Sequence, residues 1–390
     1  MIFKRKLIRW VPALLLGLCI SGCSSITQYY DDFFGRSDPK LLPKPLSEFT
    51  PTAAPKISWQ ANVGSSESFV FSPALDTNVI YAAGKAGKLV GFDAASGKIV
   101  WQAESKQAIS GGVGSNDDVI AVGTSKGEVL AFGKKGELVW TSKVSSEVLS
   151  APQISDSLVV VRTVDGRIFG LSRTDGKRKW VYQRAVPVLT VRSNVGILLI
   201  GGGVFAGFPG GKLVSLDITN GTVGLELTVA QPRGVTDLER VTDITSLPWV
   251  EQRIICAVAY QGRLACFDPR KGAVVWAREI SSIAGLTADE KNIYVSDEHS
   301  VVLALDKNTG ASVWRQDKLF MRKLSTPQVF GDYVVVGDYE GYVHFFRRDN
   351  GSIASRVATD GSSISVQPLV AGKMCIIQTR AGGVFSVSLQ

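Results

Sequence analysis

The chain has 390 residues, with 43 lysines and arginines, 35 aspartates and glutamates, and 40 glycines. Four of the basic residues and none of the acidic ones precede Cys23, so the rest of the chain carries 39 basic against 35 acidic side chains. A surplus this small, with no run of lysines and arginines, argues against a nucleic-acid-binding protein. A glycine content above the usual value of about 7% is typical of a chain with many hairpin turns.

Residues 1–22 have the pattern of a targeting segment, with a basic start and an apolar run at 11–20 that is too short to be a good spanning helix. The following Ile20-Ser-Gly-Cys23 resembles the bacterial lipobox, whose cysteine is acylated and becomes the new N-terminus. The resemblance implies a signal peptide at 1–22 and a lipidated Cys23. Ser24, where an aspartate would retain the protein, implies sorting to the outer membrane. We therefore expect a protein that is lipid-anchored on the periplasmic side rather than membrane-spanning.

Residues 23–55 form the next segment, which contains five prolines. Prolines favour an extended, semi-rigid spacer. We expect a poorly ordered tether between the lipid and a single domain at 56–390.

That domain is built from repeats, which in their full form have a turn, a short apolar strand, an Asp-to-Gly turn and a second strand that ends in tryptophan. The repeats open at positions 87, 127, 166, 211, 262, 300, 341 and 382. A period near 40 with several short strands per unit is typical of a β-propeller, in which small sheets stack around an axis. In the third repeat we expect four strands, at 147–151, 158–162, 168–172 and 179–183.

The last repeat stops before its final strand, and the missing piece stands at the other end of the chain. Lys56-Ile-Ser-Trp59-Gln-Ala matches Lys98-Ile-Val-Trp101-Gln-Ala. We infer that the N-terminal strand completes the C-terminal sheet, which closes the ring and shelters two exposed edges. The sequence therefore predicts an all-β fold, an eight-bladed propeller of four-stranded antiparallel blades.

Six tryptophans recur at one position of the repeat, which predicts a structural role in packing between blades. They are Trp59, Trp101, Trp140, Trp180, Trp276 and Trp314. Leu225 and Ser355 replace tryptophan in two repeats, so we expect those blades to be looser or differently packed.

The sequence offers no catalytic constellation. The repeated aspartates Asp93, Asp217, Asp268 and Asp306 precede a turn that ends in glycine, where aspartate binds backbone N–H groups. His299 and His344 stand at non-equivalent positions without a supporting motif, and no nucleophile elbow, phosphate loop or zinc motif occurs. We expect no catalytic residue, no cofactor and no metal site. Cys256 and Cys266 flank a hairpin turn, and a disulfide and two free buried thiols are equally compatible with that spacing.

Departures from the repeat are where a binding surface is expected. The connections 180–211 and 225–262 are longer than the others, and if both run from an outer to an inner strand they share one face of the ring. Their side chains suit a partner site with an apolar centre and a charged rim, the alternative being two long solvated loops. The candidate residues are Leu189, Val191, Arg192, Asp237, Glu239, Arg240 and Asp243.

The repeats resemble those of pyrroloquinoline-quinone dehydrogenases, which also build eight blades with docked tryptophans. This chain lacks the vicinal cysteine pair and the haem motif of those enzymes, and it is far shorter. The resemblance concerns the blade, and a fold alone does not carry function.

The combination of lipobox, tether and eight repeats resembles the BamB family, lipoproteins of the outer-membrane β-barrel assembly machinery. The specific stretches are Pro187-Val-Leu-Thr-Val-Arg192 and Leu238-Glu-Arg-Val-Thr-Asp243. The resemblance implies a non-enzymatic scaffold that binds the periplasmic domains of the central barrel subunit, beside other assembly lipoproteins, and aids insertion of outer-membrane proteins. It assigns partner contacts to Leu189, Val191 and Arg192, and an acidic pair to Asp243 and Thr245, of which Thr245 departs from the family.

Three functions therefore compete. The first is the assembly scaffold, which could also offer strand edges to extended, unfolded clients by β-augmentation. The second is a periplasmic quinone-dependent dehydrogenase, for which the sequence supplies no cofactor ligands. The third is a ring that binds sugar or cell-wall polymer, which would need exposed aromatic residues that the repeat does not leave free.

Overall fold

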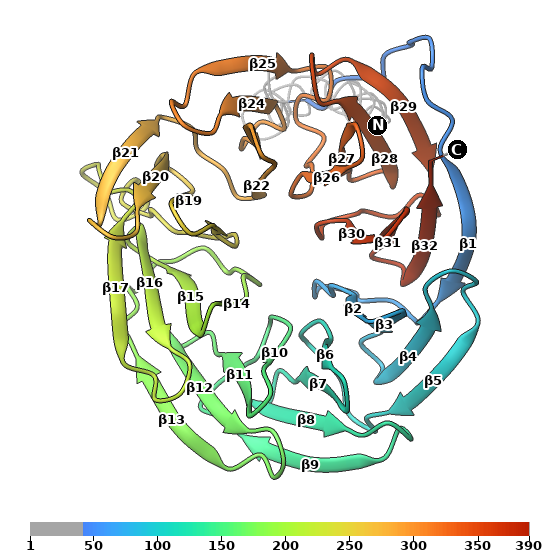
Figure 1. The fold of residues 1–390 in the computed structure, drawn as a ribbon, viewed down its shortest axis with the longest axis vertical. Helices are drawn as coiled ribbons and strands as arrows, with labels where there is room; N and C mark the ends of the chain where they lie inside the picture. Colours follow the sequence, from blue (N-terminus) through green and yellow to red (C-terminus); the bar gives the residue numbers. More distant parts are fainter. Residues whose placement is uncertain (1–41, 390) are drawn as a thin grey trace, which may run out of the picture. The chain divides into compact units, whose positions relative to one another are not determined.

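The computed structural model describes residues 42–389, and the expected signal peptide and Cys23 lie outside this range. From Pro45 onward the chain forms one compact unit. Its strands make eight separate four-stranded antiparallel sheets that follow one another around a ring (Figure 1). The predicted eight-bladed propeller is confirmed. The part of the chain that the structure describes contains no helix long and apolar enough to cross a membrane.

We number the blades in chain order: blade 1 is β2–β5, blade 2 is β6–β9, blade 3 is β10–β13, blade 4 is β14–β17, blade 5 is β18–β21, blade 6 is β22–β25, blade 7 is β26–β29, and blade 8 is β30–β32 with β1. The innermost strands have two to four residues each and border the centre of the ring (Figure 1). They are β2 (Ala74–Asp76), β6 (Gly114–Asn116), β10 (Gln153–Ile154), β14 (Leu198–Ile200), β18 (Trp249–Val250), β22 (Gly285–Ala288), β26 (Gln328–Phe330) and β30 (Leu369–Ala371).

The two middle strands of each blade are its buried part, because both of their faces pack against neighbouring blades. The second strands are β3 (Val79–Ala83), β7 (Val119–Gly123), β11 (Leu158–Arg162), β15 (Gly203–Phe208), β19 (Ile255–Val258), β23 (Asn292–Ser296), β27 (Tyr333–Gly337) and β31 (Met374–Gln378). The third strands are β4 (Lys88–Asp93), β8 (Glu128–Phe132), β12 (Arg167–Ser172), β16 (Lys212–Asp217), β20 (Leu264–Asp268), β24 (Val302–Asp306), β28 (Tyr342–Arg347) and β32 (Gly383–Ser388).

The outer strands form the rim and are mostly exposed. They are β5 (Ile99–Glu104), β9 (Leu138–Lys143), β13 (Arg178–Gln183), β17 (Val223–Thr228), β21 (Ala273–Arg278), β25 (Ser312–Gln316), β29 (Ile353–Ala358) and β1 (Lys56–Asn62). In each of them the pairing register shifts at one residue, for example between Gly91 and Phe92 opposite β5. A bulge of this kind interrupts the ladder and twists the edge, which discourages another chain from adding a strand.

The ring closes as the sequence predicted. Strand β1 pairs antiparallel with β32, with Lys56 opposite Ser388 and Asn62 opposite Gly383. Blade 8 therefore takes its outer strand from the start of the domain and its other three from the end (Figure 1).

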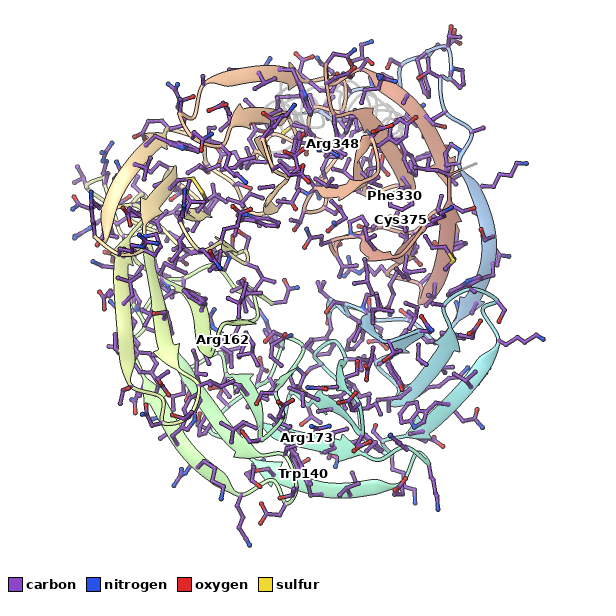
Figure 2. All side chains as sticks on the ribbon, in the orientation of Figure 1. Trp140, Arg162, Arg173, Phe330, Arg348 and Cys375 are labelled. Atoms are coloured by element: carbon purple, nitrogen blue, oxygen red, sulfur yellow. A yellow bond between two sulfur atoms is a disulfide. The ribbon has the colours of Figure 1, made fainter. Side chains whose placement is uncertain are left out.

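The indoles of the outer strands link neighbouring blades. Each indole N–H donates to a backbone carbonyl of the next blade at 2.8–3.0 Å, as from Trp140 to Arg173 and from Trp180 to Ile218. The glycine that ends the next blade's turn lies against the indole in most of these pairs. Gly176 has φ +68°, and a Cβ there would overlap Trp140. Figure 2 labels Trp140 and Arg173 side by side.

The two blades without tryptophan depart from this pattern. In blade 4, Leu225 packs only loosely against the turn of blade 5. A Cβ atom added to Gly272 of that turn would still lie 3.9 Å from the Leu225 side chain, whereas at most of the tryptophan junctions it would overlap the indole. In blade 7, residues 45–55, which we call the strap, cover the outer strand instead. Thr52 N–H donates to the Ala354 carbonyl at 2.9 Å, and Leu46 and Phe49 pack on the core of this blade. Residues expected to belong to a loose tether thus lie within the compact unit.

One strand prediction in the third repeat was wrong. The innermost strand of blade 3 is β10 at Gln153–Ile154, and residues 147–151 are not a strand. The apolar side chain of Val148 in that segment is buried against Gly123 of blade 2. Apolar side chains in this segment fill the junction between blades 2 and 3, so its sequence resembles that of a buried strand.

Candidate functional site

Both long connections run from an outer to an inner strand. Residues 184–197 join β13 to β14, and residues 229–248 join β17 to β18. Because strand direction alternates within each blade, such connections emerge on the same face of the ring. We call residues 187–192, which the sequence predicts to contact a partner, the docking loop, and residues 231–240 the second loop.

The docking loop presents apolar and basic side chains to solvent. Val188 is fully exposed and Leu189 is 49% exposed, while Val191 is partly buried. The Arg192 side chain is 70% exposed, and its Nη2 lies 3.0 Å from Oε2 of Glu147 in blade 3. An exposed ion pair of this kind contributes about 0–1 kcal/mol, so Arg192 can exchange Glu147 for a partner group at little cost.

Asp243 does not belong to an exposed charged rim, contrary to the expectation from the sequence, because it is only 3% exposed. Its Oδ2 accepts a hydrogen bond from the Val191 N–H at 2.7 Å, and its Oδ1 accepts one from Gly210 at 3.4 Å. Its backbone forms isolated bridges to Pro209 and Tyr260. Asp243 therefore ties the docking loop to the junction between blades 4 and 5.

Burial raises the pKa of the Asp243 carboxyl, and the two backbone N–H donors and the nearby Arg162 oppose that rise. Burial likewise lowers the pKa of Arg162 to about 10. With a pKa of about 10, Arg162 is charged at neutral pH despite its burial. Arg162 was not among the residues predicted from the sequence, although it departs from the repeat. The same position, four residues before the repeat opening, holds a small or uncharged residue in the other copies: Ala83, Gly123, Gly207, Val258, Ser296, Gly337 and Gln378.

Thr245, to which the resemblance in sequence assigned half of an acidic pair, is also buried. Its hydroxyl donates to the Ile283 carbonyl at 3.1 Å, and its own carbonyl accepts from Ser193 at 3.5 Å. Thr245 therefore links Ser193 to the connection that enters blade 6, through its backbone carbonyl on one side and its hydroxyl on the other.

The second loop is exposed along its whole length, including Asp237 and Arg240. Glu239 caps it locally: Oε2 accepts from the N–H groups of Val235 at 2.9 Å and Thr236 at 3.0 Å. These bonds lower the pKa of the Glu239 carboxyl. Val235 is 95% and Leu238 is 70% exposed, so this loop also offers apolar surface.

A cavity of about 790 Å³ lies among the inner ends of the blades, with Arg192 and Val191 on its wall. Its lining mixes apolar side chains, such as Leu247 and Leu369, with hydroxyl groups, such as those of Ser72 and Ser300. Within residues 42–389 no group of three or more histidine, cysteine or acidic side chains could hold a metal ion.

The repeated aspartates serve their turns. Asp93 accepts from the Ser96 N–H at 2.8 Å, and Asp217, Asp268 and Asp306 accept equivalent bonds from Thr219, Arg270 and Thr309. The hydroxyl and backbone bonds of Ser96 lower the pKa of Asp93. The four carboxylates therefore accept hydrogen bonds from the backbone of their own turns.

The sequence left open whether two of the cysteines form a disulfide, and the structure links them. Cys256 and Cys266 lie directly opposite each other on β19 and β20 and form a disulfide. Cys375 is a buried free thiol (Figure 2), and burial raises its pKa to about 12. A thiol with such a pKa is unreactive at neutral pH.

The chain is thus a closed eight-bladed β-propeller with two long loops on one face. The family model described as "Outer membrane protein assembly factor BamB" matches residues 85–316 and 298–389. Curated proteins of that name are similar over nearly the full length: one from Nitrosomonas eutropha is 44% identical over 97% of this chain and 95% of its own, and one from Escherichia coli is 31% identical over 98% and 99%. The chain belongs to the BamB family.

Solved structures agree with this assignment. The crystal structure of BamB from Moraxella catarrhalis superposes with a TM-score of 0.80 at 28% identity, covering 86% of this chain and all of that one. A quinohemoprotein alcohol dehydrogenase from Comamonas testosteroni has a TM-score of 0.69 at 11% identity, covering 86% of this chain and 76% of that one. At that identity the second likeness concerns the fold alone.

Proposed function

We propose that the protein is an assembly factor for outer-membrane proteins that works as a non-catalytic scaffold, held at the periplasmic side of the outer membrane by lipid on Cys23. Its membership of the BamB family, whose curated members are named as outer-membrane protein assembly factors, supports this role. The partner is the periplasmic part of the central β-barrel subunit of the assembly machinery.

The observation that carries the proposal is the docking loop. It displays Leu189 and Arg192 on a backbone that the buried Asp243 holds in place. A protruding apolar side chain beside a weakly paired arginine, on a loop that loses little entropy on binding, is the combination found at binding hot spots. Glu239 and Arg240 of the second loop supply the charged rim.

The residues divide into contacts and supports. Leu189 and Arg192 touch the partner. Val191 and Asp243 position them, since the bond from the Val191 N–H to the Asp243 carboxylate is internal. Thr245 supports the same segment from blade 6 through Ile283.

The test is an affinity pull-down from detergent-solubilised outer membrane with the tagged protein as bait. We expect the wild type to retain a large barrel protein, and Arg192→Glu and Asp243→Ala to lose most of it while remaining folded. Arg253→Glu, an exposed arginine in the turn between β18 and β19, is the matched charge-reversal control and keeps the barrel protein bound. Equal recovery with all four baits would contradict the assigned surface.

A further inference from the structure

Behind the docking loop lies an arginine that makes no ordinary ion pair. Arg162 ends β11, and its Nη1 is sealed from solvent without a hydrogen-bond partner. Its guanidinium carbon lies 4.9 Å from the ring centre of Phe208, the last residue of β15. Figure 2 places Arg162 on the inner side of blades 3 and 4.

The acidic group whose charge opposes the effect of burial on the pKa of Arg162 is Asp243. Both residues contact the end of β15: the Arg162 guanidinium lies over the Phe208 ring, Ile244 N–H donates to the Phe208 carbonyl at 3.4 Å, and Pro209 forms an isolated bridge with Asp243. The Asp243 carboxylate has the N–H groups of Val191 and Gly210 as its hydrogen-bond donors, and Arg162 supplies the opposing charge.

A buried charge is costly, and an apolar residue of similar volume is often neutral or stabilising in its place. The other repeats show that the blade itself needs no charge at this position, where they hold mostly small residues. The charge of Arg162 is therefore explained by its effect on a neighbouring group and not by the packing of the blade.

We propose that Arg162 is a positioning residue for the docking loop: its charge balances the buried Asp243 carboxylate, which in turn holds the Val191 N–H and so fixes Leu189 and Arg192. Arg162 itself touches no partner. The inference rests on the proposed function and adds a residue that controls the same surface from inside the blade.

The first test uses the isolated full chain and measures hydrogen-exchange protection of the Val191 amide as a function of pH, corrected for intrinsic exchange. In Arg162→Gln we expect protection at neutral pH to fall about tenfold. We also expect the pH midpoint for its loss to rise by about one unit, because an opposite charge no longer favours ionised Asp243. Arg162→Lys restores most of the protection. Asp243→Asn removes the pH midpoint.

The matched control is Arg184→Gln. Arg184 lies over the same Phe208 ring at 5.8 Å but is paired with Glu226 at 2.9 and 3.2 Å. This variant should keep both the protection and the midpoint of the wild type. If Arg162→Gln does not fold, Arg162→Met fills the same space without charge and carries the same prediction. If Arg162→Gln or Arg162→Met folds and keeps the wild-type protection of the Val191 amide and the wild-type pH midpoint, the proposal is overturned.

The second test measures binding of the purified periplasmic domains of the barrel subunit. Arg162→Gln should bind about tenfold more weakly, and Arg184→Gln like the wild type. Unchanged affinity together with lost Val191 protection would overturn the positioning role. If even the wild type does not bind, the proposed function fails, and the amide measurement still decides whether Arg162 acts on the docking loop.

Discussion

The indole N–H of Trp59 donates a hydrogen bond to the carbonyl oxygen of Ala94 at 2.9 Å, which joins the strand that completes blade 8 to the turn of blade 1. The same residue packs against Phe92, with ring centres 5.7 Å apart. The two ends of the ring are thus held by a side chain as well as by the pairing of β1 with β32.

Replacing Trp59 with alanine removes this link, and we expect the free energy of unfolding to fall by about 3 kcal/mol, the low end for a buried tryptophan because Trp59 is partly exposed. Urea denaturation followed by tryptophan fluorescence measures the change. Ser58→Ala, on the same strand with an exposed hydroxyl contact, is the control and should change stability by less than about 0.5 kcal/mol. A loss below about 1 kcal/mol for Trp59→Ala would mean that the link is not important for closure.

Leu225→Trp should stabilise the protein, because blade 4 lacks the indole that fills this junction elsewhere. Filling such a gap typically adds about 0.5–2 kcal/mol. Val223→Trp, exposed on the same strand, should give no gain. Thermal unfolding of the two variants beside the wild type makes the comparison, and a destabilised Leu225→Trp would show that Leu225 is already fully packed.

Loss of the Cys256–Cys266 disulfide should cost about 3 kcal/mol of stability, the value expected for a cross-link that closes a loop of about ten residues. The double variant Cys256→Ala, Cys266→Ala tests this by urea denaturation. Peptide mapping without reductant should find these two cysteines linked and Cys375 free. A free thiol at all three positions in the secreted protein would refute the pairing.

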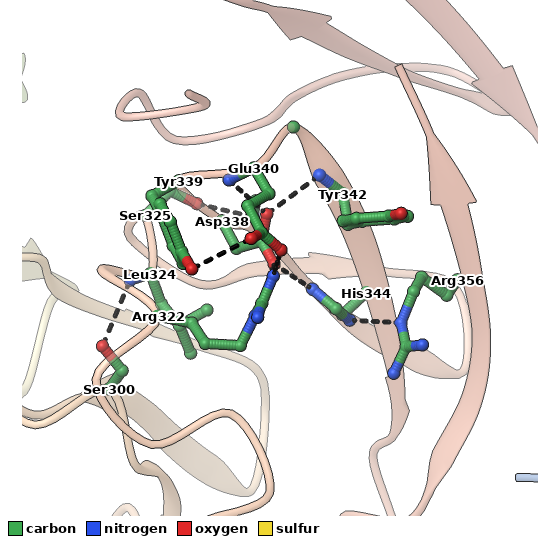
Figure 3. Close-up of polar contacts among 12 residues, drawn as sticks. Ser300, Arg322, Leu324, Ser325, Asp338, Tyr339, Glu340, Tyr342, His344 and Arg356 are labelled. Carbon is green, nitrogen blue, oxygen red and sulfur yellow. Dashed lines mark hydrogen bonds and ion pairs between the residues drawn. The ribbon is translucent and has the colours of Figure 1, made fainter. Parts of the chain in front are cut away.

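A buried charge cluster in blade 7 predicts a dependence of stability on pH. His344 is fully buried, its Nε2 lies 2.9 Å from Oδ2 of Asp338, and its Nδ1 accepts a bond from Arg356 Nε at 3.3 Å (Figure 3). Arg322 also binds Asp338, at 2.8 Å, and pairs with Glu340. Burial, with the positive charges of Arg356 and Arg322, lowers the pKa of His344 against the opposing pull of Asp338.

Because the folded protein resists protonation of His344, the unfolded chain takes up the extra proton as the pH falls. The contribution of this group to stability is therefore full above its unfolded pKa of about 6.5 and is lost below it, at no more than about 1.4 kcal/mol per pH unit. Denaturation of the wild type and His344→Gln between pH 7.5 and 5 measures the difference. His299→Gln, at an exposed position, should keep the wild-type slope, and a His344→Gln slope equal to the wild type would contradict the assignment.

The same cluster fastens the strap. Arg356 Nη2 donates to the Ser47 carbonyl at 3.3 Å, and its guanidinium lies 5.2 Å from the Phe49 ring centre. Protonation of His344 would remove the acceptor of the Arg356 Nε bond and place two positive charges side by side, so acid should loosen residues 45–55 from blade 7. Limited proteolysis at pH 7.5 and 5 would detect cleavage near Phe49, and Arg356→Met should show it already at pH 7.5.

The repeat determined how much of this could be predicted from the sequence. A fixed period with tryptophan at one position specifies strands, turns and closure through Trp59, because the same packing recurs in each blade. Innermost strands of two to four residues carry no such period, so the buried loop around Val148 was taken for one. The strap was missed because its contacts, such as the bond from Thr52 N–H to the Ala354 carbonyl, are made by residues outside the repeat and leave no trace in its period.

The site was predicted less completely, for a physical reason. Leu189 and Arg192 stand out as residues of a lengthened connection, but burial is not visible in a loop sequence. Asp243 therefore resembled a rim charge, although its carboxylate is sealed against the Val191 backbone. Arg162 differs from the small residues at its repeat position, but its relationship to Asp243 depends on how blades 3, 4 and 5 pack together.

The most direct measurement of the partner surface is site-specific photo-crosslinking in living cells, with a photoreactive residue at Leu189 and, as control, at Val313 of β25, which is similarly exposed at 46%. The account predicts that Leu189 gives one major adduct with the central barrel subunit and that Val313 does not. Adducts of equal yield at both positions, or an adduct with this subunit from Val313 alone, would contradict it.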